Sequence, residues 1–167
     1  KVLYDGAIAD QEYDDIDWSE SVRISDLAMA RTLPLRQHIG QFLSSFPPAE
    51  LVDGLESLKI QYSSSMRRMA FRLLKWQKSA LGNCFRKKAD IDSVVFSFEP
   101  IQEPDTDCCL RVDWEYRQKD RYLKIEYSRS RKSGLIRTCL PSGEFEHPLH
   151  IEPLEAEAVL GEAMFFG

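Results

Sequence analysis

Four cysteines and three histidines are the side chains of this 167-residue chain best suited to metal binding or nucleophilic chemistry. No pair of cysteines has the C-x-x-C spacing of a zinc site, and Cys108 and Cys109 are adjacent. His147 and His150 stand three residues apart in a segment that we expect to be a strand, which places them on opposite faces. The sequence therefore predicts no metal site and no cofactor.

Catalytic motifs are also missing from the sequence. There is no glycine-rich phosphate loop, no G-x-S-x-G and no H-E-x-x-H. A nucleophilic cysteine needs a base and a group that orients the base, and neither can be identified for Cys108 or Cys109. Asp113 and Glu115 share a predicted strand face with Arg111, which favours cross-strand charge pairing over acid–base chemistry. We therefore expect a protein that is not an enzyme.

Segregated charge is the strongest chemical signal in the chain. Residues 1–58 carry eleven acidic and four basic side chains, whereas residues 57–89 carry nine basic side chains and no acidic one. The overall net charge of −5 conceals this basic segment. Segregated charge creates local fields that act on partners, while net charge mainly governs solubility. The basic segment is therefore the predicted contact surface.

A basic amphipathic stretch can bind nucleic-acid phosphates, an acidic membrane surface or an acidic groove of a protein. The isoelectric point of about 5.3 argues against a dedicated nucleic-acid binder. We predict a protein partner, with nucleic acid as the alternative. A third interpretation is that the basic residues form a solvated helix face whose charge is balanced by the chain's own acidic residues, and that they bind no partner. The predicted partner-binding residues lie in the basic segment and in one serine-rich loop: Arg67, Arg68, Arg72, Lys75, Lys78, Arg129, Arg131 and Lys132.

The first 22 residues are predicted to form an acidic, aromatic arm in front of a single domain, residues 23–167. Residues 10–20 contain six acidic side chains, together with Tyr13, Ile16 and Trp18. This mixture is too charged for a core strand, and its aromatic residues favour docking on another surface. We expect the arm to contact the basic segment, within the molecule or in a neighbouring copy, so a homo-oligomer is compatible with the sequence.

The spacing of apolar residues predicts helices in the first half of the chain. Residues 24–45 have helical spacing, and Pro34 should end or kink a turn. Pro48 suits the first turn of the next helix. An apolar series from Leu51 to Phe85 recurs every three or four residues and predicts one long basic amphipathic helix. Its weak point is Ser63–Ser65, and it ends near Arg86 or, at the earliest, at Gly82-Asn83.

From residue 94 onward the apolar period changes to two, which is typical of strands. Residues 94–98 predict a buried strand, and residues 108–128 predict a hairpin with Trp114 inside and Arg111 outside. Further strands are expected over residues 135–140 and 145–151. The predicted fold is α+β: N-terminal helices including one long basic helix, a four- to five-stranded antiparallel meander, and a short C-terminal helix after Pro153. The alternating polar face implies that helices cover only one side of the sheet.

This order of elements resembles bacterial adaptor, secretion-chaperone and immunity-protein folds in architecture alone. No apolar run approaches the roughly 20 residues that cross a bilayer, and the first residues lack the apolar core of a signal peptide. We therefore expect a cytoplasmic protein with reduced thiols. The predicted function is a non-enzymatic protein-interaction module of adaptor, chaperone or immunity type. A nucleic-acid-binding accessory protein is the alternative, and an enzyme with an unrecognised site is the third hypothesis.

Overall fold

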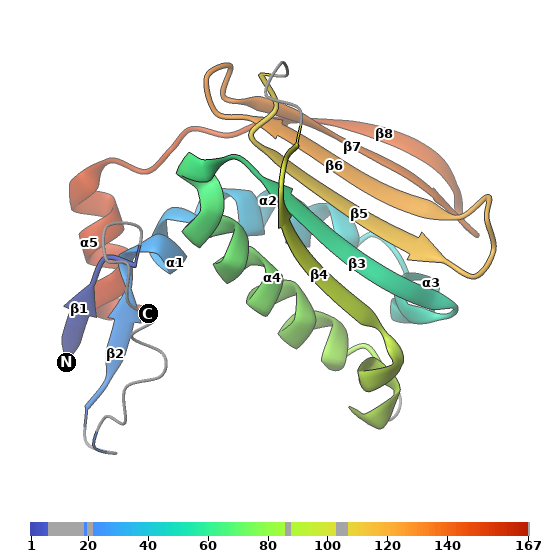
Figure 1. Cartoon of the computed structure of the whole chain (residues 1–167), viewed down its shortest axis with the longest axis horizontal. Helices are drawn as coiled ribbons and strands as arrows, with labels where there is room; N and C mark the ends of the chain where they lie inside the picture. The colour runs from blue at the N-terminus through green and yellow to red at the C-terminus, as the bar shows by residue number, and fades with distance from the viewer. Residues whose placement is uncertain (7–18, 20–21, 86–87, 103–106, 167) are drawn as a thin grey trace.

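The computed structural model describes residues 1–6, 19, 22–85, 88–102 and 107–166. It has an α+β fold, as predicted, built on a six-stranded sheet of order β4-β3-β5-β6-β7-β8 (Figure 1). Of the predicted arm, residues 1–22, the stretches 7–18 and 20–21 lie outside the described residues, and these include almost all of its acidic and aromatic segment, residues 10–20. The strands of the sheet are β3 (Leu55–Tyr62), β4 (Val95–Pro100), β5 (Leu110–Tyr116), β6 (Tyr122–Ser128), β7 (Ser133–Leu140) and β8 (Gly143–His150).

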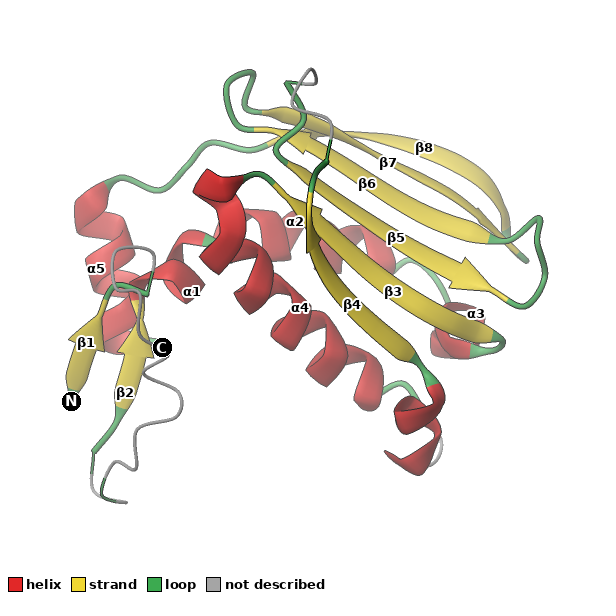
Figure 2. Cartoon of the chain, in the orientation of Figure 1, coloured by secondary structure: helices red, strands yellow, loops and turns green. Residues whose placement is uncertain are grey.

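Helices cover one face of this sheet (Figure 2). The covering helices are α2 (Leu33–Leu43), α3 (Pro48–Val52) and α4 (Arg67–Gly82). Beside them, α1 (Leu27–Arg31) and α5 (Ala156–Phe165) pack with the two-stranded parallel sheet of β1 (Val2–Tyr4) and β2 (Ile24–Asp26). Two 3₁₀ turns, Ser64–Met66 and Lys88–Ser93, flank α4. Pro34 and Pro48 lie in the first turns of α2 and α3, as expected for residues without a backbone N–H.

The antiparallel part of the sheet confirms the predicted hairpin and its register. Trp114 of β5 is 1% exposed on the helix-covered face. The opposite face carries a row of charged cross-strand neighbours on successive strands: Lys59–Asp113, Asp113–Lys124 and Arg137–Glu146 join opposite charges, whereas Lys124 and Arg137 are like charges. Opposite charges directly across a ladder stabilise strand pairing. The uncovered face of the sheet is therefore charged, in contrast to the apolar face that the helices cover.

The predicted helix from Leu51 to Arg86 is confirmed over its basic part, α4, and is wrong for the residues between Asp53 and Met66. The chain turns at Gly54, whose φ of +76° lies in the left-handed region that glycine adopts without steric cost. It then forms strand β3 before α4 begins at Arg67. A bulge between Leu55 and Ser57 shifts the register, so Leu55 and Leu58 are both buried although three residues separate them. A bulged strand therefore produced the three-residue spacing of a helix.

The predicted place of residues 94–98 in the meander is also wrong. This segment forms β4, which pairs in parallel with β3 at the edge of the sheet, while β3 lies between β4 and β5. Parallel neighbours need a crossover connection, and α4 supplies it. The antiparallel meander thus consists of β5 to β8. Because α4 connects β3 to β4, it packs on the face of these two strands that the helices cover.

The interior divides into two apolar clusters. The larger lies between the sheet and α2, α3 and α4, and includes Leu58, Leu73 and Trp114. The smaller joins Ala30 of α1 to Val159 and Ala163 of α5, with Leu3, Leu27 and Leu154 against them. In the described part of the chain, no helix combines the length and apolar character needed to span a bilayer.

Candidate functional site

The predicted partner-binding residues of the basic segment divide into two groups on α4. Arg68 and Arg72 face Asp26 at the start of α1, with Nε–Oδ2 distances of 3.2 and 2.5 Å. Both guanidinium groups also donate to the hydroxyl of Tyr4 in β1. The Asp26 side chain is 3% exposed. These two arginines therefore join α4 to the unit formed by β1, β2 and α1.

Asp26 is satisfied by the backbone as well as by the two arginines. Its Oδ1 accepts from the N–H of Ala28 at 2.8 Å, which caps the first turn of α1, and from the N–H of Gly6 at 3.1 Å. A buried carboxylate needs this number of donors, because burial removes its water. The acid that meets the basic helix in the described residues is thus Asp26, which follows the predicted arm in sequence.

The other three predicted residues of α4, namely Arg67, Lys75 and Lys78, are exposed. With Phe71 they follow one another at spacings of four, four and three, so they form one stripe along the helix. The ammonium of Lys75 lies 4.6 Å from the ring centroid of Phe71, and that of Lys78 lies 5.1 Å from the ring of Phe96. Both distances fall within the range of cation–π attraction.

The predicted loop residues connect β6 to β7. Arg131 pairs with Asp107 at 2.7 Å, and Lys132 pairs with Glu152 at 2.6 Å, which raises the pKa of Lys132. Arg129 is exposed and lines a small cavity of about 90 Å³ together with Met66 and Met69, just before and within the first turn of α4. The loop thus lies near the start of α4, whereas Lys78 lies about 16 Å further along the helix from Arg67.

Cys109 and His147, two of the side chains considered for nucleophilic or metal chemistry, have structural partners. The thiol of Cys109 donates to the carbonyl of Tyr127 at 3.3 Å, and burial raises its pKa. A raised pKa is opposite to what a nucleophilic cysteine requires. His147 stacks on Phe42 with ring centroids 5.4 Å apart. Across the residues that the structure describes, no three His, Cys, Asp or Glu side chains come together as a metal site.

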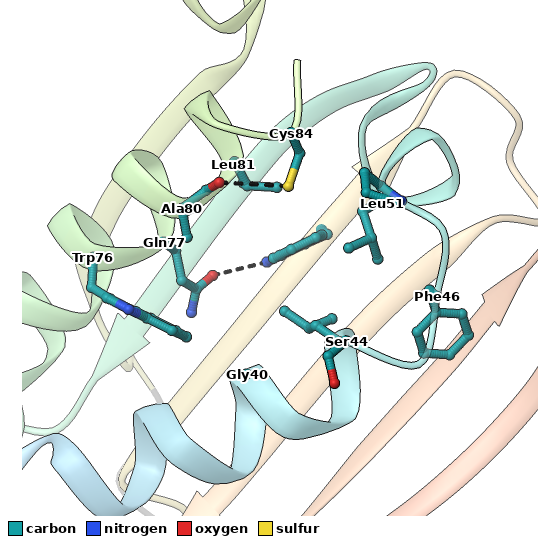
Figure 3. Close-up of a pocket in the computed structure, with 12 residues that line it drawn as sticks. Gly40, Ser44, Phe46, Leu51, Trp76, Gln77, Ala80, Leu81 and Cys84 are labelled. Carbon is teal, nitrogen blue, oxygen red and sulfur yellow. Dashed lines mark hydrogen bonds between the residues drawn. The ribbon is translucent and has the colours of Figure 1, made fainter. Parts of the chain in front are cut away.

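An apolar pocket lies under the sheet, between α2, α3 and the C-terminal half of α4 (Figure 3). Its volume is about 300 Å³, at the lower end of the range for sites that hold small organic ligands. Its walls carry no charged side chain. They are formed by Gly40, Leu43, Ser44, Phe46, Pro48, Leu51, Trp76, Gln77, Ala80, Leu81, Cys84 and Trp114.

Gln77 is the polar side chain in these walls that is nearly completely buried. It is 1% exposed, and its Oε1 accepts a 3.0 Å hydrogen bond from the indole Nε1 of Trp114. Its amide Nε2 is buried and has no hydrogen-bond partner among the described residues. Figure 3 shows this nitrogen directed toward α2, across the pocket. An unsatisfied buried donor costs about 1–3 kcal/mol, so this nitrogen is the group in the pocket most in need of a partner.

Sequence reasoning missed this pocket. Gln77 belongs to the basic amphipathic stretch and was assigned to neither of its faces, although it follows Leu73 by four positions and precedes Leu81 by four. A polar residue inside the apolar series of a helix was the available signal, because that series is the buried face. The helices that close the pocket come from separate parts of the chain, so their approach could not be read from local spacing.

Comparison with protein-family models, with curated proteins and with solved structures found no match to this chain. The site is therefore interpreted from its own geometry.

Proposed function

We propose that this protein is a non-enzymatic binding module whose main site is the apolar pocket under the sheet, and that the pocket binds a small apolar ligand. The observation that carries the proposal is the buried amide nitrogen of Gln77, which faces the pocket without a partner. Concave apolar sites with a few placed polar groups are the usual form of small-molecule sites.

Gly40 supports this proposal because it keeps space open in the pocket. It lies within α2, where glycine costs roughly 0.5–1 kcal/mol relative to alanine. A Cβ at this position would lie 3.8 Å from Cζ2 of Trp76, at ordinary contact distance, so alanine fits. A longer side chain would extend into the space between α2 and α4.

The experiment uses N-phenyl-1-naphthylamine, an uncharged probe whose fluorescence rises in apolar surroundings. We expect saturable binding to the parent protein and to Gly40→Ala. Gly40→Leu should lose most of the binding, because its side chain occupies the pocket. The alanine variant is the matched control for changes in helix propensity. Equal probe binding by a folded Gly40→Leu variant, or no binding by the parent, would overturn the proposal.

A second candidate function is binding of a protein partner through α4, with nucleic acid as the alternative. The stripe of exposed Arg67, Lys75 and Lys78 with half-buried Phe71 favours it, because basic and aromatic side chains together suit an acidic, partly apolar surface. Reversing the three charges to glutamate should abolish capture of that partner and leave the fold intact, because surface charges contribute little to stability. Loss of the captured material on nuclease treatment would favour nucleic acid, as would a steep dependence of affinity on salt.

A further inference from the structure

We infer that the ligand of the apolar pocket is uncharged and carries a hydrogen-bond acceptor, such as a ketone, ester or amide carbonyl oxygen, which accepts from Nε2 of Gln77. This inference rests on the proposed function and specifies its ligand class.

The orientation of the Gln77 amide is fixed by its neighbour. The indole nitrogen of Trp114 is a donor only, so it must face the amide oxygen. The NH₂ end consequently points away from Trp114, toward α2 (Figure 3). The pocket therefore presents a donor, and an acceptor on the ligand is its complement.

Ser44 and Cys84, two further polar side chains of the pocket, donate to backbone carbonyls three and four residues before them. The hydroxyl of Ser44 donates to the carbonyl of Gln41 at 2.7 Å, and the thiol of Cys84 donates to the carbonyl of Ala80 at 3.5 Å. Burial also raises the pKa of Cys84, which keeps the thiol neutral at physiological pH. Gln77 is thus the group that selects the polar part of the ligand.

The absence of charge in the pocket walls selects against ionised ligands. A carboxylate or ammonium group would lose its water without gaining a charged partner, which is strongly unfavourable. A carbonyl oxygen loses less hydration, and one hydrogen bond from Gln77 compensates for it. The broad apolar side chains of Trp76, Phe46 and Leu51 would contact the rest of the ligand. The chemistry fits a compact, largely apolar compound with one carbonyl oxygen.

The test compares acetophenone with ethylbenzene, a pair that differs in a carbonyl group against a methylene group. Affinities are measured by titration calorimetry or ligand-observed NMR for the parent protein and for Gln77→Met, which removes the donor at similar volume. The ratio of the acetophenone affinity to the ethylbenzene affinity should fall about tenfold in Gln77→Met, in line with the loss of one buried hydrogen bond. Comparing ratios removes the difference in hydrophobicity between the two compounds.

A measurement on the unchanged protein guards against a variant that does not fold. The side-chain NH₂ signals of Gln77, identified by their proximity to the indole proton of Trp114, should move on titration with acetophenone and much less with ethylbenzene. Benzoate should bind more weakly than acetophenone. If both neutral compounds bind and the ratio is unchanged in Gln77→Met, or if they move the NH₂ signals equally, the inference is wrong while the pocket proposal stands. If neither compound binds while N-phenyl-1-naphthylamine does, the inference is wrong and the pocket proposal stands; if the parent binds none of the three, both fail.

Discussion

The indole N–H of Trp114 donates to the side-chain oxygen of Gln77 at 3.0 Å, and this bond joins the middle of the sheet to the helix that covers it. Both side chains are 1% exposed. The bond therefore has a structural role as well as orienting the amide in the pocket, and the two roles can be separated by experiment.

A double-mutant cycle with Gln77→Met and Trp114→Phe should give a coupling free energy of about 1 kcal/mol, the usual net value of a buried neutral hydrogen bond. Chemical denaturation of the parent, the two single variants and the double variant measures it. Additive losses in unfolding free energy would show that the bond contributes nothing to stability.

Asp26→Ala should lower the free energy of unfolding by about 3–5 kcal/mol, because it leaves the partly buried guanidinium groups of Arg68 and Arg72 without their carboxylate. Glu99→Gln is the control, since the Lys59–Glu99 pair is 3.6 Å long and each side chain is 38% exposed. This exposed pair should contribute less than about 0.5 kcal/mol. Similar denaturation midpoints for the two variants would contradict the importance assigned to Asp26.

Alanine should have opposite effects at two glycines. Gly54→Ala places a side chain at a φ of +76° and should destabilise the protein by about 1–2 kcal/mol. Gly161→Ala, within α5 and with nothing within 4 Å of the added Cβ, should stabilise it by roughly 0.5–1 kcal/mol. Thermal or chemical unfolding of both variants tests the pair. A stabilised Gly54→Ala variant would show that the turn after α3 is misplaced.

Asp113→Asn should stabilise the protein at neutral pH. Burial raises the pKa of Asp113, and Lys124 and Lys59 only partly oppose the rise. A carboxyl with a raised folded-state pKa favours the folded form when protonated, so its contribution is present below the unfolded pKa and lost as pH rises through the folded value. The difference in unfolding free energy between the variant and the parent should therefore shrink as pH falls from 7 toward 4. If this difference instead grows as the pH falls, the folded-state pKa of Asp113 is lowered rather than raised, and the prediction is wrong.

The hairpin of β5 and β6 could be predicted from the sequence because apolar and polar residues alternate strictly around Trp114. When one face of a sheet is buried, only one register places all of these apolar side chains inside. The helical prediction for residues 55–62 failed because the bulge at Leu55–Ser57 gave a strand the apolar spacing of a helix. Local spacing is ambiguous in such a segment, and pairing with β4 and β5 decides its conformation.

The basic segment could be recognised from composition, but its division could not. Arg68 and Arg72 lie on the side of α4 that faces Asp26, whereas Arg67 and Lys75 lie on the exposed side. Asp26 precedes Arg68 by 42 residues and Arg72 by 46 residues, so local spacing does not show which side faces it. The pocket has the same origin, because Gly40, Leu51 and Gln77 converge only after α2, α3 and α4 are packed on the sheet. Contacts between distant segments decide both sites.

The two apolar clusters divide the molecule into units of unequal cooperativity. The cluster of Ala30, Val159 and Ala163 is small and consists of short elements from both ends of the described chain, whereas the larger cluster spans the six-stranded sheet. Sub-global opening follows such boundaries. Amide hydrogens of β1, β2, α1 and α5 should therefore exchange with solvent as one group, at a lower free energy than those of β3 and β5. On this expectation the first and last described elements open together, although they are most distant in sequence.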